Sequence, residues 1–111
     1  MILTDKTKDD FLEFSGCHEI YFKRNYSEVC QIAQIIEWFD SVGIYIMISV
    51  EFDTMGNYNR GFDASIYQER ESIVNYVCKD NDVFFDRKEA TEAAILKANE
   101  LYNAKFGWNF V

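Results

Sequence analysis

The chain has no proline, a single histidine and only five glycines among its 111 residues. No repeat, low-complexity run or linker-like segment divides the sequence. Hydrophobic residues make up 49% of the chain and aromatic residues 17%, which supplies ample apolar surface for one core. We therefore expect residues 1–111 to form a single compact domain.

Long hydrophobic runs are also missing. The uncharged part of the most apolar segment, "WFDSVGIYIMISVEFD", extends only from Ser41 to Val50, whereas a membrane-spanning helix needs about 20 apolar residues. The opening "MILTDKTKDD" has charged residues directly after a short apolar start and no cleavage-site pattern. We expect a cytoplasmic protein without a membrane partner.

Paired cysteines are lacking as well, because Cys17, Cys30 and Cys78 are odd in number and form no CxxC motif. A disulfide framework or a zinc site is therefore not expected, and the thiols are predicted to be reduced and mostly buried. Cys17 precedes His18, but neighbouring side chains rarely point at each other and no third orienting group is identifiable. We assign no catalytic residue.

Motifs that carry chemistry are absent too: there is no phosphate-binding glycine loop, no GxSxG and no HExxH. The acidic pairs Glu51/Asp53 and Asp80/Asp82 lack the twelve-residue calcium loop with its closing glutamate. We expect no metal and no cofactor. A hydrolase that uses two carboxylates stays open, because such pairs are recognised by their separation in space.

Acidic residues, by contrast, are abundant. The formal net charge is −8, from 19 acidic and 11 basic residues, and residues 31–85 contain nine acidic and three basic side chains. Affinity for nucleic acid comes mostly from neutralisation of phosphates by lysine and arginine. Direct binding of nucleic acid is therefore not expected, and an anionic membrane surface is disfavoured likewise.

Helical patterns occupy three regions. A short N-terminal helix is predicted near 5–14, started by Thr4 or Thr7 and ended by Gly16. A second helix is predicted from Ser27, as its N-cap, to Ser41, with Gly43 as its stop. Its expected apolar stripe consists of Val29, Ile32, Ala33, Ile36 and Phe39.

The third and clearest helix is predicted over 86–106, where Asp86 and Glu89 form a start that resembles a capping box. Its expected buried face contains Ala90, Ala94, Ala98, Leu101 and Tyr102, with Glu92, Leu96, Glu100 and Asn103 on the far side. The segment "HEIYFKRNY" is either a short strand or an extended connection.

Strict alternation predicts a strand over 44–53, with aliphatic residues at even positions and an amphipathic, acidic face at odd ones. Further strands are expected in "GFDASIYQ" and "SIVNYVCK", with a very short fourth in "VFF". The turns between them are too short for helical crossovers. The expected fold is α+β: a three- or four-stranded antiparallel sheet packed by two main helices, plus the short N-terminal helix.

Three segments, "LTDKTKDDF", "FDSVGIYI" and "RKEATEAAILKANELYN", resemble parts of small, mostly uncharacterised proteins encoded by phages and prophages of Bacteroidetes-type bacteria. The resemblance implies an accessory protein of a mobile element in a bacterial host, and it carries over no catalytic residue. It is similar in type, though not in motif, to anti-CRISPR proteins. That type implies a host protein partner, in particular a basic nucleic-acid-handling enzyme.

On this interpretation an acidic and aromatic surface is steered to a groove lined by lysine and arginine. The candidate partner-binding residues are those of the odd-numbered strand face and the hairpin tip: Tyr45, Met47, Glu51, Asp53, Tyr58, Asp63 and Tyr67. Two alternatives stay open. One helix covers each face of the sheet, so that Tyr45 and Met47 belong to the core; or the chain is a self-assembling phage component.

Overall fold

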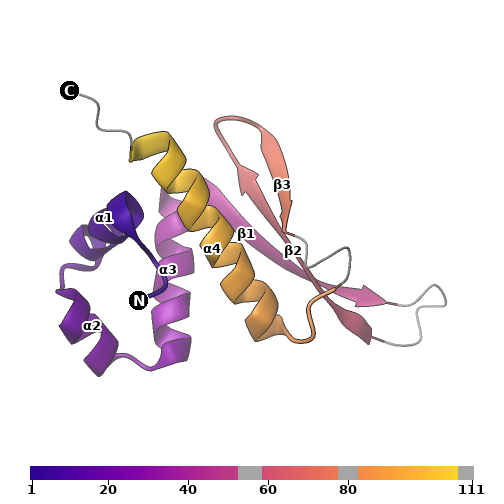
Figure 1. Ribbon diagram of the computed structural model, residues 1–111, viewed down its shortest axis with the longest axis horizontal. Helices are drawn as coiled ribbons and strands as arrows, with labels where there is room; N and C mark the ends of the chain where they lie inside the picture. The colour runs from indigo at the N-terminus through magenta and orange to yellow at the C-terminus, as the bar shows by residue number, and fades with distance from the viewer. Residues whose placement is uncertain (53–58, 78–82, 108–111) are drawn as a thin grey trace.

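The computed structural model describes residues 1–52, 59–77 and 83–107. Its elements follow in the order α1 (Asp5–Ser15), α2 (Glu19–Asn25), α3 (Glu28–Ser41), β1 (Ile44–Phe52), β2 (Asn59–Gln68), β3 (Ile73–Val77) and α4 (Arg87–Phe106). Figure 1 shows the helices gathered on one side of the molecule and the sheet extending away from them. The described residues thus confirm an α+β fold with a short N-terminal helix.

The sheet has three antiparallel strands in the order β1-β2-β3. Ile46 lies opposite Ile66 and Ile48 lies opposite Ala64, so the even-numbered side chains of both strands share one face. The expected fourth strand in "VFF" is not an independent strand of the described sheet. Phe84 instead forms an isolated bridge with Phe62, through two backbone N–H···O bonds of 2.9 Å.

The register of β1 and β2 shifts between Glu51 and Phe52. Gly61 stands opposite Glu51 with φ +140°, and a Cβ atom at this position would come within 2.5 Å of the Phe84 carbonyl oxygen. Only glycine combines this backbone conformation with such a close approach. Gly61 therefore permits the Phe84 bridge beside the bulge.

Helix α4 packs its small residues onto the even-numbered face of the sheet. Ala90, Ala94 and Ala98 are completely buried, as the sequence predicted, and Leu96 is 53% exposed on the opposite side. The short alanine side chains let the helix backbone approach the strands closely. The completely buried Ile95 belongs to the same core, although it was not expected there.

Helix α3 begins at the predicted N-cap, where the Ser27 side chain accepts a hydrogen bond from the Cys30 N–H at 3.3 Å. Its predicted apolar stripe is confirmed in part, because Phe39 is buried and Ile32 and Ile36 pack against the core. Val29, by contrast, is 77% exposed and Ala33 is exposed as well. The buried residues are Ile35, Trp38 and Phe39.

The buried face of α3 is rotated relative to the predicted stripe, because burial of Trp38 removes far more apolar surface from water than burial of Ala33 would. The Trp38 ring packs against three aromatic rings, with centroids 6.0 Å from Phe11, 5.0 Å from Phe39 and 4.9 Å from Tyr102. One aromatic cluster therefore joins α1, α3 and α4.

The segment after Cys17 is the helix α2, so neither a strand nor an extended connection is correct. One residue anchors it, since Phe22 is completely buried with its ring 5.1 Å from that of Phe11. At its start, the Glu19 carboxylate accepts from the N-terminal ammonium group at 3.3 Å and from Lys8 at 3.4 Å. A single anchor leaves no periodicity for the sequence to reveal.

The N-terminus of α1 is capped by side chains of α4. Of the two expected starts, Thr4 is the N-cap, but its side chain makes no cap bond. Instead the Asn99 Oδ1 accepts from the Thr4 N–H at 2.9 Å, and the Asn103 Oδ1 accepts from the Thr7 N–H at 2.8 Å. The two asparagines lie four residues apart, one turn of α4, so Asn103, which was expected on the outer side of the helix, is directed at α1.

Candidate functional site

The odd-numbered face of the sheet, which we call the open face, lies opposite the helices. The main core cluster combines buried side chains of α3 and α4 with the even-numbered Ile44 and Ile66. Both main helices therefore cover the same side of the sheet, and the alternative with one helix on each face is wrong. The open face comprises Tyr45, Met47, Ser49, Glu51, Asp63, Ser65, Tyr67, Val74 and Tyr76.

Five of the seven residues predicted to bind a partner come together on this surface: Tyr45, Met47, Glu51, Asp63 and Tyr67. The predictions for Asp53 and Tyr58 concern positions outside the described residues. The strand register divides the open face into an aromatic and aliphatic half, near the β2–β3 turn, and an acidic half, toward the other end of β1.

The aromatic half contains a tyrosine pair from neighbouring strands. Tyr45 lies opposite Tyr67, with ring centroids 6.3 Å apart and ring planes inclined by 21°. The Tyr45 hydroxyl donates to the Glu69 carboxylate at 3.0 Å. This hydrogen bond, with the carboxylate charge, raises the pKa of Tyr45. The pair is held in place before any partner arrives.

Sequence reasoning missed two residues of the aromatic half, both on β3. Val74 lies opposite Tyr67 and is 43% exposed, while Tyr76 lies opposite Ser65 and is 77% exposed. The alternation of the predicted strand "SIVNYVCK" carried the signal. It places Val74 and Tyr76 on one face of β3, and this face continues the open face of β2. Met47, at 42% exposure, completes this group.

The acidic half holds the carboxylate side chains of Glu51 and Asp63. Asp63 lies opposite the exposed Ser49, and Glu51 lies opposite Gly61. Their carboxylates adjoin residues with small side chains, so this half presents negative charge beside backbone and hydroxyl groups.

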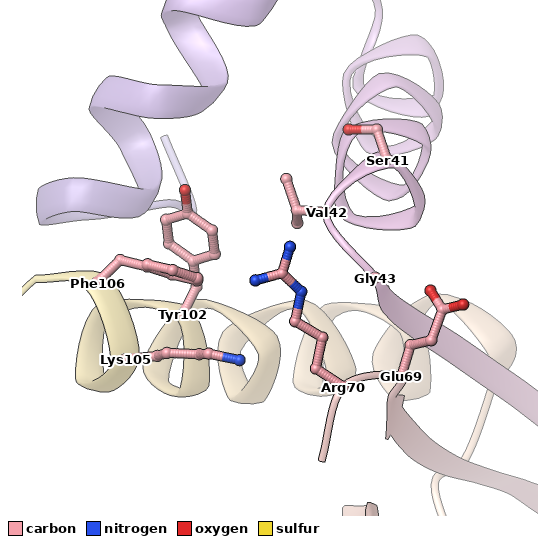
Figure 2. Close-up of a pocket in the computed structure, with 8 residues that line it drawn as sticks. All are labelled: Ser41, Val42, Gly43, Glu69, Arg70, Tyr102, Lys105 and Phe106. Atoms are coloured by element: carbon pink, nitrogen blue, oxygen red, sulfur yellow. The ribbon is translucent and has the colours of Figure 1, made fainter. Parts of the chain in front are cut away.

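A cleft of about 350 Å³ is the other candidate site. Figure 2 shows it between the α3–β1 junction, the β2–β3 turn and the end of α4, with the Arg70 side chain extending into its middle. Lys105 reaches it from α4 and is paired with Glu71. Helices α3 and α4 both end here, and helix C-termini favour cations over anions. Arg70 therefore places a cation between two helix ends, where an anionic ligand would meet the negative ends of both helices.

The cysteines take no part in a catalytic arrangement within the described residues. The Sγ atom of Cys17 lies 3.3 Å from the Ser15 hydroxyl, and no hydrogen bond joins Cys17 to His18 in the part of the chain that the structure describes. Cys30 is exposed, which contradicts the expectation of mostly buried thiols. Among residues 1–52, 59–77 and 83–107, no group of three potential ligands is placed to hold a metal ion.

Comparisons with known proteins give no match: no family model, no curated protein and no solved structure is significantly similar to this chain. Within the described segments, every helix is too short or too polar to cross a bilayer. The assignment of the site therefore depends on its geometry and chemistry.

Proposed function

We propose that this chain is a non-enzymatic protein-binding domain that docks the open face onto a basic surface of a nucleic-acid-handling protein and inhibits it. The observation that carries the proposal is the composition of that face. It presents tyrosine, methionine and valine side chains next to the carboxylates of Glu51 and Asp63.

Each half of the open face fits one part of a protein interface. Tyrosine and methionine are enriched in the buried centres of interfaces, where a few anchors provide most of the binding energy. Tyr76 is the most exposed of these side chains and is suited to enter a pocket of the partner. Carboxylates at the edge of an interface accelerate association with a cationic surface and orient it.

The whole molecule supports the same class of partner. A net charge of −8 on 111 residues repels nucleic acid but is attracted to the lysine- and arginine-lined grooves that bind nucleic acid. The resemblance to phage-encoded proteins favours a defence nuclease as the target, as for anti-CRISPR proteins. Occupation of the groove would then exclude the nucleic acid.

Direct inhibition tests this proposal. A panel of purified, guide-RNA-loaded CRISPR nucleases is assayed for cleavage of target DNA with the domain in excess, and binding is measured by surface plasmon resonance at low and high salt. We expect inhibition of at least one nuclease, with an affinity that falls as ionic strength rises.

Matched variants then locate the surface. Glu51→Lys with Asp63→Lys reverses two charges on the open face, and Asp9→Lys with Glu13→Lys reverses two exposed charges on α1. We expect the first pair to abolish inhibition and the second to weaken it only slightly. Equal losses from both pairs would contradict docking through the open face.

A second matched pair tests the aromatic half. Tyr76→Ser removes an anchor from the open face, and Tyr21→Ser removes a 54% exposed tyrosine from α2. Loss of an interface anchor costs about 2 kcal/mol, or roughly 30-fold in Kd. We expect this loss for Tyr76 alone. Inhibition that resists both substitutions would contradict the proposal.

A further inference from the structure

Strand β1 is a long strand at the edge of the sheet. It has nine residues, whereas the mean strand has about five or six. The order β1-β2-β3 leaves its outer side without a neighbouring strand among the described residues. In Figure 1, β1 extends well beyond the helices.

The direction of its backbone groups follows from the Phe84 bridge. Phe62 donates its N–H to Phe84 and accepts from it, so it cannot also bond to Val50, its partner on β1. In an antiparallel pair, residues with and without mutual hydrogen bonds alternate. The N–H and C=O groups of Ile44, Ile46, Ile48 and Val50 therefore point away from the sheet, and none of these groups has another partner in the described segments.

Over residues 44–50, before the register shift at Glu51, the edge lacks several of the features that usually prevent strands from pairing. Natural edge strands carry lysine, proline or inward-pointing charges, whereas β1 has no proline, no lysine and no arginine, and its one charged residue is Glu51 near the end. Ile46 and Ile48 are only partly buried at this border, while Ile66 on the central strand is completely buried. A neighbouring strand would cover the remaining apolar surface.

We propose that two copies of the chain associate by antiparallel pairing of their β1 strands about a two-fold axis at Met47. In this register Ile46 bonds to Ile48 of the second copy, and Ile44 bonds to Val50 of the second copy. All four outward-pointing residues of each strand then have hydrogen-bonding partners. Other registers leave some of these groups without a partner.

The side chains are compatible with this pairing. Tyr45 comes to lie opposite Ser49 of the second copy. Glu51 lies opposite Gly43, beside the Glu69 carboxylate, so one pair of acidic groups approaches at each end of the paired strands and adds a repulsion that salt screens. Because the strands run in opposite directions, the two α3 helices lie at opposite ends of the paired strands. The two open faces merge into one surface with two acidic halves, which suits a partner with repeated cationic sites.

Sedimentation velocity of the unmodified chain, from low to high micromolar concentration, tests the association without any other protein. Each copy carries −8, so repulsion opposes the dimer and salt relieves it. We expect a monomer–dimer equilibrium that strengthens as ionic strength rises. A monomer at every concentration and salt level would overturn the proposal, and so would pairing of β1 with an added extended peptide in place of a second copy.

Two lysine variants distinguish the edges. Met47→Lys places two lysines next to each other at the two-fold axis, and Tyr76→Lys makes the same change in charge on β3, at the other edge. We expect at least a tenfold weaker dimer for Met47→Lys, with an unchanged thermal transition, and an intact dimer for Tyr76→Lys. The reverse order would assign the dimer to β3 and overturn the proposal.

A disulfide reports the register directly. In a chain with its three cysteines replaced by serine, Met47→Cys places two thiols in a pair without mutual hydrogen bonds, where antiparallel strands approach most closely. We expect mild oxidation to cross-link it far faster than the matched Tyr76→Cys chain. Equal rates would contradict the register. These results do not depend on inhibition of a nuclease, so this inference and the proposed function can fail separately.

Discussion

The two faces of the sheet are made by the same three strands, yet they differ in almost every property. On the covered face Ile66 is completely buried and Ala64 is 3% exposed, while on the open face Met47 is 42% and Tyr76 77% exposed. Alternation along the strands separates the two sets of side chains. Burial of one set follows from the position of α3 and α4, which both pack on the even-numbered side. Strand periodicity therefore says which residues share a face, and helix placement says which face remains available to a partner.

The largest contrast should come from truncation of matched positions on β2. Ile66→Ala removes a completely buried side chain, and we expect a loss of about 2–5 kcal/mol in the free energy of unfolding. Ser65→Ala, one residue earlier on the open face, should change it by less than about 0.5 kcal/mol. Urea unfolding followed by circular dichroism measures both. Similar values would show that the two faces are not distinguished by packing.

Polar contacts on the helical side should rank next. Asn103→Ala removes the Oδ1 atom that accepts from the N–H and from the hydroxyl of the buried Thr7, each at 2.8 Å. The Thr7 N–H then loses its acceptor, while the hydroxyl keeps the Asn99 carbonyl oxygen at 3.1 Å. We expect a loss of about 1–3 kcal/mol. Glu100→Ala, on the exposed side of the same helix, serves as the control and should be close to neutral. An equally stable Asn103→Ala chain would mean that water replaces the asparagine at the end of α1.

Tyrosine ionisation offers a finer comparison of the two sides. Burial, together with the hydrogen bond to Asp10 at 2.5 Å, raises the pKa of Tyr102 well above its usual value. The unfolded chain then releases this proton first, near pH 10, so the free energy of unfolding should fall as the pH rises above that value. Tyr102→Phe should remove most of this dependence, whereas Tyr45→Phe on the open face should remove little. The opposite result would place the dominant alkaline transition on the sheet.

The smallest effect is expected where the open face is most exposed. Tyr76→Ser should change the free energy of unfolding by less than about 0.5 kcal/mol, because a residue at 77% exposure has few packing contacts to lose. Differential scanning calorimetry provides the measurement. A marked destabilisation would indicate that Tyr76 supports the fold, and it would remove this residue from the proposed interface.

Much of the sheet and of helix α4 was predictable, because their signals are periodic. The alternation in β1 and β2 assigned Tyr45, Met47 and Tyr67 to one face without reference to the rest of the chain. The alanine stripe of α4 identified its buried side in the same way. In both cases the hydrophobic pattern repeats over several residues, so one atypical residue does not hide it.

Features that depend on single residues could not be predicted. Helix α2 has one buried side chain, Phe22, and the face of α3 is decided by Trp38, which packs against two other helices. The isolated bridge of Phe84 depends on the space left by Gly61, far away in sequence. The candidate site was only partly predictable for the same reason. The alternation within each strand shows which of its residues share a face, but placing Val74 beside Tyr67 requires the pairing register of β2 and β3.

The caps supplied by Asn99 and Asn103 also affect the order in which the chain can fold. These contacts join residues separated by 92 to 99 positions, so the residues at the start of α1 are synthesised long before their partners. While the chain emerges from the ribosome, α1 lacks the groups that complete its first turn. Contacts of such sequence separation close large loops and slow folding. Helix α1, which is made before the other described helices, should therefore be among the last to become stable, once α4 has been completed.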